Sequence, residues 1–455
     1  MSGKKNKVIT FIFFITILII WRPDYIHNDN STSRALAVMS LVEQGQLHFD
    51  QYAHLTGDKS FINGHVYSDK APLPVFIVYP VIKLIQIFGL YPDEVTSRLN
   101  LVLVAGGFLV SVLPLVLIMF FLYNHLEDRK SSYRNYWLVT LPIMSGFLWV
   151  YNFSFYSHIL AGFFIILAYL FIERGKYLVA GIISGLAFLT EYPVVVIPGV
   201  WILLEVIKFR KIKPAFTFIT GLIPVASLLL LYNYMQSGQI LQLSYDYVSD
   251  DYAQMKENYG FGLPSLNAIW GMTFSTYRGL LFFAPLFFPV VLVAIYYFIR
   301  KKESLKNFIT HPWFIPFVIY ILLISAYFMW WGGWSFGPRH LIPIVLFIFF
   351  YEIKENHLKN FFSPFLIIGF IGLLFMLIVK STVMYGFPSG LNPFTEVLFP
   401  AIKEGITNPM NLPTIIFGIK PTSSAILWLA IYLLAGLLIS RNKSDYNFVS
   451  STPDK

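Results

Sequence analysis

Long apolar segments separated by short polar connectors follow one another along most of the 455-residue chain. Residues 108–121 and 425–439, for example, contain no charged side chain. Together with their apolar flanks, segments of this kind are typical of membrane-spanning helices. The pattern predicts about 12 spans, near residues 8–22, 98–123, 135–150, 158–172, 177–190, 193–207, 214–234, 278–299, 313–331, 341–352, 361–380 and 422–440.

We therefore expect an all-α polytopic membrane protein with about 12 (11–13) transmembrane helices. Hydrophobic residues make up 56% of the chain and charged residues only 13%, whereas about 25% of a soluble domain is charged. The longest polar segment is partly apolar itself and the last one is short, so we expect a single transmembrane domain over residues 1–455. The chain contains no cysteine, which excludes disulfides and cysteine-ligated metal sites.

The charge distribution predicts the orientation of the spans. Lys and Arg residues cluster in alternate connectors, at 127–134, 173–176, 208–213, 300–306, 354–359 and 441–443. Cytoplasmic loops carry such clusters, so both termini are expected in the cytoplasm, including the tail 441–455. This also explains the net charge of +9 without a nucleic-acid partner. Lys4 and Lys5 precede the first span and no small-residue cleavage site follows it, which predicts an uncleaved signal anchor in the cell (inner or plasma) membrane.

The same assignment puts the larger polar loops on the extracytoplasmic face, at 22–97, 236–277, 331–340 and 381–420, joined by the short turns 151–157 and 190–192. The first of these loops is expected to carry two juxtamembrane helices. Asn28 to Ser31 form a helix-start signal, and 35–42 have amphipathic spacing before Gly45, which predicts a helix on the membrane surface. Residues 75–88 predict a juxtamembrane or re-entrant helix ending at Gly89, because a further span would break the charge alternation. Asn63 and Gly64 predict a turn.

Asp29 and Lys70 are the candidates in the first loop. Asp29 could act as a general base at the outer membrane surface, or could simply be the N-cap of the following helix. The sequence Asp69-Lys70-Ala71-Pro72 could hold a phosphate through Lys70. Alternatively, Lys70 lies in a solvated loop and reaches toward lipid headgroups. Both pairs of interpretations remain open at this stage.

Two arginines, Arg278 and Arg339, each begin a span from the outer side. An Arg at this depth is costly unless it is paired or used, and its guanidinium matches the geometry of a phosphate. The tryptophans near Arg339 suit an interfacial aromatic belt, but such a belt does not explain Gly332, Gly333 and Gly337, which permit turns or close approach of the backbone.

The short outer turns contain further candidates. Glu191 and Tyr192 lie in a tight turn where Glu191 could orient a sugar hydroxyl or pair with an Arg, although an ordinary turn residue is an equal reading. His158 could carry a proton or bind a ligand, or be a hydrogen-bonded interfacial residue. The supporting or substrate-binding set is completed by Arg34, Asp69 and His340. A divalent cation could be held by Asp29, Asp69 and His158, but no ligand spacing requires a metal or another cofactor.

Taken in order, these motifs resemble the GT-C superfamily of polytopic glycosyltransferases, especially the protein O-mannosyltransferase and lipid A aminoarabinose transferase type. The corresponding features are Asp29 after the first span, the helix at 31–44, Lys70-Ala71-Pro72-Leu73, the apolar stretch 75–89 and Arg98-Leu99. A bacterial branch reads much like Ser33-Arg34, 67–72, 189–193, Arg278-Gly279-Leu280 and 333–339. The resemblance covers roughly residues 20–345, and Ala71 stands where the first proline of the motif is usual.

The resemblance implies a GT-C fold and an inverting sugar transfer. Asp29 would be the base, and Lys70, Arg278 and Arg339 would bind the phosphate of a polyprenyl-phosphate-linked sugar donor, whose charge develops as the sugar leaves. The acceptor would be a lipid, a glycan or a protein, and the surrounding membrane lipids would be the remaining partners. Two alternatives are a lipid or polyanion transporter, which usually places charges near the bilayer midplane, and a surface-glycan ligase or polymerase.

Overall fold

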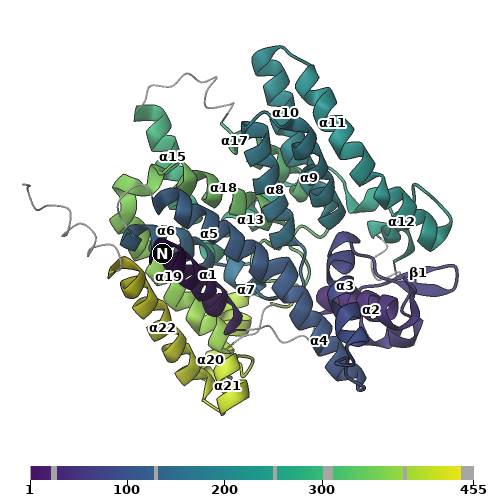
Figure 1. Ribbon diagram of the computed structural model, residues 1–455, viewed down its shortest axis with the longest axis horizontal. Helices are drawn as coiled ribbons and strands as arrows, with labels where there is room; N and C mark the ends of the chain where they lie inside the picture. Colours follow the sequence, from purple (N-terminus) through teal and green to yellow (C-terminus); the bar gives the residue numbers. More distant parts are fainter. Residues whose placement is uncertain are drawn as a thin grey trace, which may run out of the picture.

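The computed structural model describes residues 2–21, 28–127, 132–248, 254–300, 311–382 and 387–441 (Figure 1). The protein is mostly helical, and in the described part the strands form one two-stranded sheet. The described residues therefore agree with the prediction of an all-α membrane protein.

The elements up to residue 209 are α1 (Ser2–Ile19), α2 (Asp29–Gln44), η1 (Asp50–Leu55), β1 (Ser60–Ile62), β2 (His65–Tyr67), α3 (Leu73–Ile87), α4 (Val95–Gly107), η2 (Phe108–Val112), α5 (Leu113–Glu127), α6 (Ser132–Met144), α7 (Leu148–Tyr151), α8 (His158–Glu173), α9 (Tyr177–Thr190), η3 (Tyr192–Val195) and α10 (Val196–Phe209). The remaining elements are α11 (Lys213–Ala226), α12 (Leu228–Ser237), η4 (Ser244–Tyr247), η6 (Asn258–Gly260), α13 (Leu266–Thr273), α14 (Leu280–Phe283), α15 (Phe287–Arg300), α17 (Phe314–Ser325), η7 (Arg339–Leu341), α18 (Ile342–Lys354), η8 (His357–Phe361), α19 (Phe362–Thr382), η9 (Pro393–Leu398), α20 (Phe399–Lys403), α21 (Leu412–Phe417) and α22 (Pro421–Arg441).

Five continuous helical stretches of the described chain are long and apolar enough to cross a membrane: Val95–Leu126, Tyr192–Phe209, Lys213–Ser237, His357–Thr382 and Pro421–Ile439. Each coincides with a predicted span. The other predicted spans coincide with helices that are shorter or interrupted, such as α8 and α9. The segment predicted at 278–299 is divided into α14 and α15 around Pro285, because proline lacks the N–H that a continuous helix needs.

The first predicted loop helix is present as α2, and it ends where the sequence predicted. Gly45 adopts a left-handed conformation (φ 69°), and its N–H donates to the carbonyl of Leu41, which terminates the helix. The N-cap is Asn28 and not Asp29, since the Asn28 side chain accepts from the N–H of Ser31 at 3.2 Å. Helix α2 is buried in the protein along most of its length. Both faces pack, the apolar one against α3 and α4.

The predicted turn at Asn63 and Gly64 connects the two strands of a hairpin that the sequence analysis did not anticipate. Both turn residues have positive φ (51° and 83°), as a two-residue hairpin loop requires. The antiparallel strands pair Ser60 with Tyr67 and Ile62 with His65. Helix α3 follows directly and ends before Gly89. Its 15 residues extend roughly 22 Å, short of the apolar thickness of a bilayer of about 30 Å.

The hydrophobic core consists mainly of two clusters that meet at α8. One contains α1, α5, α6, α18, α19 and α22, and the other contains α2, α3 and α4. Phe163 and Phe164 on α8 pack against both clusters. In Figure 1, α22 and α1 lie at one end of the molecule and the hairpin, α2 and α3 at the other.

The predicted inner and outer loops gather at different ends of the helices. Glu173, at the end of α8, pairs with Lys354 at 2.7 Å, and the carbonyl of Lys354 lies 3.2 Å from a ring nitrogen of His125. Glu173 and Lys354 belong to two predicted cytoplasmic connectors, and His125 lies just before a third, 127–134. The start of α8, at His158, lies roughly 22 Å away by helix geometry, beside the cavity described next.

Candidate functional site

A cavity of about 1380 Å³ lies where the predicted outer loops meet. Its walls come from segments distant in sequence: the start of α2, the loop around the hairpin, the turns before α8 and α10, and the segments 243–261, 323–340 and 382–406. Among the residues selected from the sequence, those that line it are Asp29, Arg34, Asp69, Lys70, His158, Glu191, Tyr192, Arg339 and His340. The structure therefore brings together nearly the whole predicted set.

Asp29 lies in the first turn of α2 with its side chain exposed to the cavity. Its Oδ1 accepts from the N–H of Gly57 at 3.0 Å, and its main-chain carbonyl accepts from the hydroxyl of Thr56 at 3.1 Å. A Cβ at position 57 would lie 3.1 Å from Oδ2, so the glycine leaves room for the carboxylate. Within the described residues, no hydrogen bond engages Oδ2. One oxygen thus fixes the carboxylate, and the other remains able to accept a proton.

Lys70 lies between two carboxylates. Its Nζ is 2.8 Å from Asp58 Oδ2 and 2.8 Å from Asp69 Oδ2. Burial alone would lower the pKa of Lys70, but the two carboxylates outweigh it and raise that pKa above the ordinary value. Because an ammonium has three N–H donors, this pairing leaves one donor for a ligand and no uncompensated positive charge. Lys70 therefore lacks the free charge that the predicted phosphate site requires.

The two carboxylates beside Lys70 differ. Burial raises the pKa of Asp69, and the charge of Asp58 adds to the effect despite Lys70. Burial also acts to raise the pKa of Asp58, but the charge and hydrogen bond of Lys70 hold it below the ordinary value. The second oxygen of Asp69, Oδ1, is buried and has no hydrogen-bond partner. Lys70 is thus equally close to two acids whose pKa values shift in opposite directions, and Asp69 is the weaker acid.

A second polar group connects α2 to the two short turns. Arg34 is 2% exposed and donates to Ser157 Oγ at 2.6 Å and to the main-chain carbonyl of Asn30 at 3.0 Å. Ser157 donates in turn to Glu191 Oε1, which also lies 3.8 Å from the Arg34 guanidinium and 3.2 Å from His158 Nδ1. Of the three interpretations left open for Glu191, the structure supports pairing with an Arg.

Arg339 is the cationic group of the cavity with the least compensation among the described residues. In the described part of the chain no carboxylate lies within ion-pair distance of Arg339, and its Nε is buried without a hydrogen-bond partner there. Its guanidinium lies over the Tyr156 ring, 5.3 Å from the centroid, and the Tyr156 hydroxyl accepts from the Asn28 side chain at 2.9 Å. Tyr156 and Asn28 thus connect Arg339 to the residue next to Asp29.

Gly332 and His340 also lie against Arg339. A Cβ at Gly332, which has φ 78°, would lie 2.9 Å from Arg339 Cγ, so only glycine lets the arginine pack there. Burial and the charge of Arg339 lower the pKa of His340 well below its ordinary value. His340 is consequently neutral, and its Nε2 is buried without a hydrogen-bond partner.

Arg278, which the sequence suggests for phosphate binding, does not line this cavity. The side chain is fully buried. Its guanidinium donates to backbone carbonyls, including those of Tyr277 at 2.9 Å and Phe387 at 2.9 Å, with longer contacts to Trp331 and Gly333. Backbone carbonyls thus accept from the Nε, Nη1 and Nη2 groups of Arg278, which a phosphate would otherwise need. Arg278 holds together the loops that frame the cavity.

Several residues of the cavity have no distinct signal in the sequence. Asp58 has no signature of its own, and Asn28 is recognisable only as part of a helix-start signal. The cavity also has an apolar wall that no local pattern indicates, since its residues are far apart in sequence: Leu243, Val248, Met255, Leu323, Ile324, Val397, Pro400, Ala401 and Ile406. Asp250, Asp251 and Tyr252, which belong to the predicted outer loop 236–277, lie outside the described part of the chain.

The residues suggested for a divalent cation do not form a metal centre. Asp29, Asp69 and His158 all line the cavity, but in the described part of the chain the one group of three converging imidazole and carboxylate ligands is His48, Asp50 and His65. This group belongs to the hairpin region and not to the lining of the cavity.

No protein-family model matches the chain, and no curated protein matches it in sequence.

Proposed function

We propose that the protein is an inverting glycosyltransferase of the GT-C type that uses a polyprenyl-phosphate-linked sugar at the extracytoplasmic face of the cell membrane. The observation that carries the proposal is a single large cavity in which the open carboxylate oxygen of Asp29 and the uncompensated guanidinium of Arg339 are joined through Asn28 and Tyr156. The first group can accept a proton and the second can stabilise a leaving phosphate.

The cavity also suits a lipid-linked donor in size and lining. Its volume of about 1380 Å³ exceeds the roughly 300–1,000 Å³ of ordinary small-molecule sites, which leaves space for a sugar donor and an acceptor together. Both charged residues and apolar ones such as Leu323 and Val397 line the cavity. The charged side chains would contact the sugar phosphate and the apolar ones the isoprenoid chain.

The proposed topology has about 12 spans with both termini in the cytoplasm and this cavity on the outer side. Helices at all the predicted positions, the positive-inside pattern, and the gathering of inner connectors around Lys354 support this arrangement. Several predicted outer loops contribute residues to the cavity, as expected if the polar residues of these loops serve one site.

In the proposed reaction, the acceptor hydroxyl attacks the anomeric carbon of the donor sugar while its proton passes to Asp29 Oδ2. The bond between the anomeric carbon and the phosphate oxygen breaks, and the electron pair leaves with the polyprenyl phosphate. Arg339 meets the charge that develops on this phosphate, and the remaining N–H of Lys70 can donate to it. Attack opposite to the leaving group inverts the configuration of the sugar.

The test is release of polyprenyl phosphate and labelled product from a panel of polyprenyl-phosphate monosaccharides in proteoliposomes. Asp29→Asn should lower turnover by about 10²–10⁴-fold, the usual contribution of a general base. Asp93→Asn is the matched control. Asp93 is an exposed residue of the same predicted outer loop, and it does not line the cavity. Full turnover in Asp29→Asn would remove the base from the mechanism, and ion-coupled uptake without sugar transfer would indicate a transporter.

A further inference from the structure

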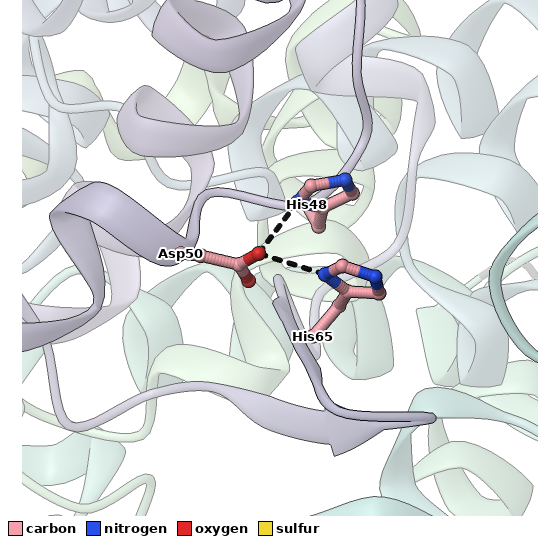
Figure 2. Close-up of side chains that lie close together, drawn as sticks. All are labelled: His48, Asp50 and His65. Atoms are coloured by element: carbon pink, nitrogen blue, oxygen red, sulfur yellow. Dashed lines mark hydrogen bonds and ion pairs between the residues drawn. The ribbon is translucent and has the colours of Figure 1, made fainter.

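Three potential metal ligands converge on the outer rim of the hairpin, separate from the cavity (Figure 2). His48 precedes η1, Asp50 begins it, and His65 begins strand β2. Their ligand atoms all lie within 4.8 Å of one another. The His48 and His65 Nδ1 atoms face the same carboxylate oxygen, Asp50 Oδ2, at 2.9 and 2.7 Å. Two imidazole nitrogens and one oxygen thus point toward one small volume.

Local structure holds these ligands in place before any ion binds. Asp50 Oδ1 accepts from the N–H of Val66 at 2.7 Å, which directs Oδ2 toward the histidines. The N–H of Phe49 donates to the carbonyl of Val66 at 2.8 Å, so the backbone between His48 and Asp50 is bonded to strand β2. The Ser40 hydroxyl on α2 donates to the carbonyl of His48. The ligands therefore depend on a bonded framework and not on loose side chains.

Hydrogen bonding does not account for the whole cluster. His65 Nδ1 has hydrogen-bond geometry to Asp50. His48 Nδ1 is equally close to the same oxygen, yet it is buried and makes no hydrogen bond. The two imidazole rings are stacked with centroids 4.1 Å apart, an arrangement that would be repulsive if both were protonated. A shared cation explains both the buried nitrogen without a hydrogen bond and the two imidazoles directed at one oxygen.

We propose that His48, Asp50 and His65 bind a divalent transition-metal ion, with Zn²⁺ as the representative, and that the ion clamps the hairpin to the end of α2. Imidazole nitrogens favour Zn²⁺, Cu²⁺ and Ni²⁺ over Mg²⁺ and Ca²⁺, which prefer all-oxygen ligands. Water would complete the coordination, because Asp50 and His65 are partly exposed to solvent.

The distances require little movement. Zn²⁺ bonds of about 2.0–2.1 Å in a tetrahedron separate the ligand atoms by roughly 3.3 Å. The observed separations of 2.9 and 2.7 Å are therefore within about 0.6 Å of that value. The two imidazole nitrogens lie within 4.8 Å of each other, so the rings would adjust by rotation to share one ion.

The position of the ion would make the hairpin loop more rigid. Residues 48–67 contain Gly57, which holds Asp29, and Asp58, which holds Lys70. Clamping the two ends of this segment would restrict the loop that carries these contacts. The metal is structural in this proposal, and the binding itself does not depend on the proposed sugar transfer.

The experiment uses the full-length protein in detergent with a tag that contains no histidine. After dialysis against a chelator, the protein is titrated with ZnCl₂ by calorimetry, and bound metal is counted by mass spectrometry. We expect one Zn²⁺ per chain, no comparable binding of Mg²⁺, and slower amide exchange across residues 48–67 with Zn²⁺. His48→Ala and His65→Ala should each weaken binding by about tenfold or more, because even supporting residues of metal sites contribute this much.

His54→Ala is the matched control, since His54 is an exposed histidine of the same segment outside the cluster. It should bind Zn²⁺ like the wild-type protein. Asp50→Asn keeps an oxygen for Val66 and should bind Zn²⁺ more weakly while the metal-free melting temperature stays near that of the wild-type protein. The proposal is overturned if the wild-type protein binds no Zn²⁺, or if His48→Ala and His65→Ala bind it as tightly as His54→Ala.

Discussion

Replacing Asp69 by asparagine removes one of two carboxylates that share a single ammonium. Lys70 Nζ is 2.8 Å from an oxygen of each acid, so the cluster of Asp58, Asp69 and Lys70 carries one more negative than positive charge. Asp69 also has a buried Oδ1 without a partner. Asp69→Asn would leave a balanced pair of Asp58 and Lys70, and we expect its free energy of unfolding to remain within about 1 kcal/mol of the wild-type value or to exceed it.

The other two substitutions in this cluster should be more harmful. Lys70→Met leaves the buried carboxylate of Asp69 and the partly buried one of Asp58 without their cation, and removal of one partner from a buried pair costs about 3–5 kcal/mol. Asp58→Asn leaves Lys70 with Asp69 alone and loses a charge-assisted hydrogen bond, worth about 1.5–3 kcal/mol. The expected order of destabilisation is Lys70→Met, then Asp58→Asn, then Asp69→Asn.

The pH dependence separates the two acids. The raised pKa of Asp69 means that the folded protein binds its proton more tightly than the unfolded chain does, so the stabilising contribution of this group is present at low pH and is lost as pH rises through the folded pKa. The lowered pKa of Asp58 acts in the opposite direction, and its contribution is lost as pH falls below the ordinary value of 3.8. Asp69→Asn should therefore gain stability relative to the wild-type protein as pH increases above 3.8.

The assay is thermal unfolding in detergent followed by tryptophan fluorescence, at pH 5 and pH 8 for the wild-type protein and the three variants. Because membrane proteins often unfold irreversibly, the scan rate is kept constant for all samples. The reasoning is refuted if Asp69→Asn is the most destabilised variant, or if its melting temperature relative to the wild-type protein falls between pH 5 and pH 8.

Three further results are expected. Arg339→Ala should lower kcat/KM for sugar transfer by about 10²–10³-fold, with Arg339→Lys between the two, because a preorganised donor to developing charge is lost; unchanged kinetics would exclude Arg339 from the site. Arg278→Met should lower the melting temperature, as several buried carbonyls lose their donor, while the activity per folded molecule is retained; strong loss of turnover in fully folded protein would contradict this. Asn28→Ala removes both the cap of α2 and the bond to Tyr156 and should cost about 0.5–2 kcal/mol of stability; an unchanged melting temperature would show that the cap contributes nothing.

Local pattern was sufficient to predict where the helices of this protein lie. Apolar segments form helices wherever they were predicted because a helix satisfies its own backbone hydrogen bonds, a requirement that depends only on nearby residues. Gly45 and Gly89 mark helix ends for the same reason, since a left-handed residue is needed there and glycine adopts it at least cost. The alternation of charged connectors likewise is a property of the chain itself.

Tertiary structure decided which charges are available. Arg278 and Arg339 look alike in sequence, each beginning a span from the outer side, yet carbonyl oxygens of two distant loops occupy the first and leave the second facing the cavity. The sequence suggests that Lys70 could hold a phosphate, but in the fold its Nζ lies 2.8 Å from Asp58 Oδ2. Electrostatic interactions act through space and depend on distance and burial, so no spacing along the chain can reveal them.

The hairpin shows the same division. Asn63 and Gly64 determined the turn, because their backbone angles favour it. The register of β1 and β2, and with it the meeting of His65 with His48 and Asp50, depends on pairing between segments that no local pattern aligns. The sequence by itself determined a mostly helical protein whose apolar helices suit a membrane. The fold determined that Asp29 and Arg339 share one cavity, because only folding brings their surroundings into contact.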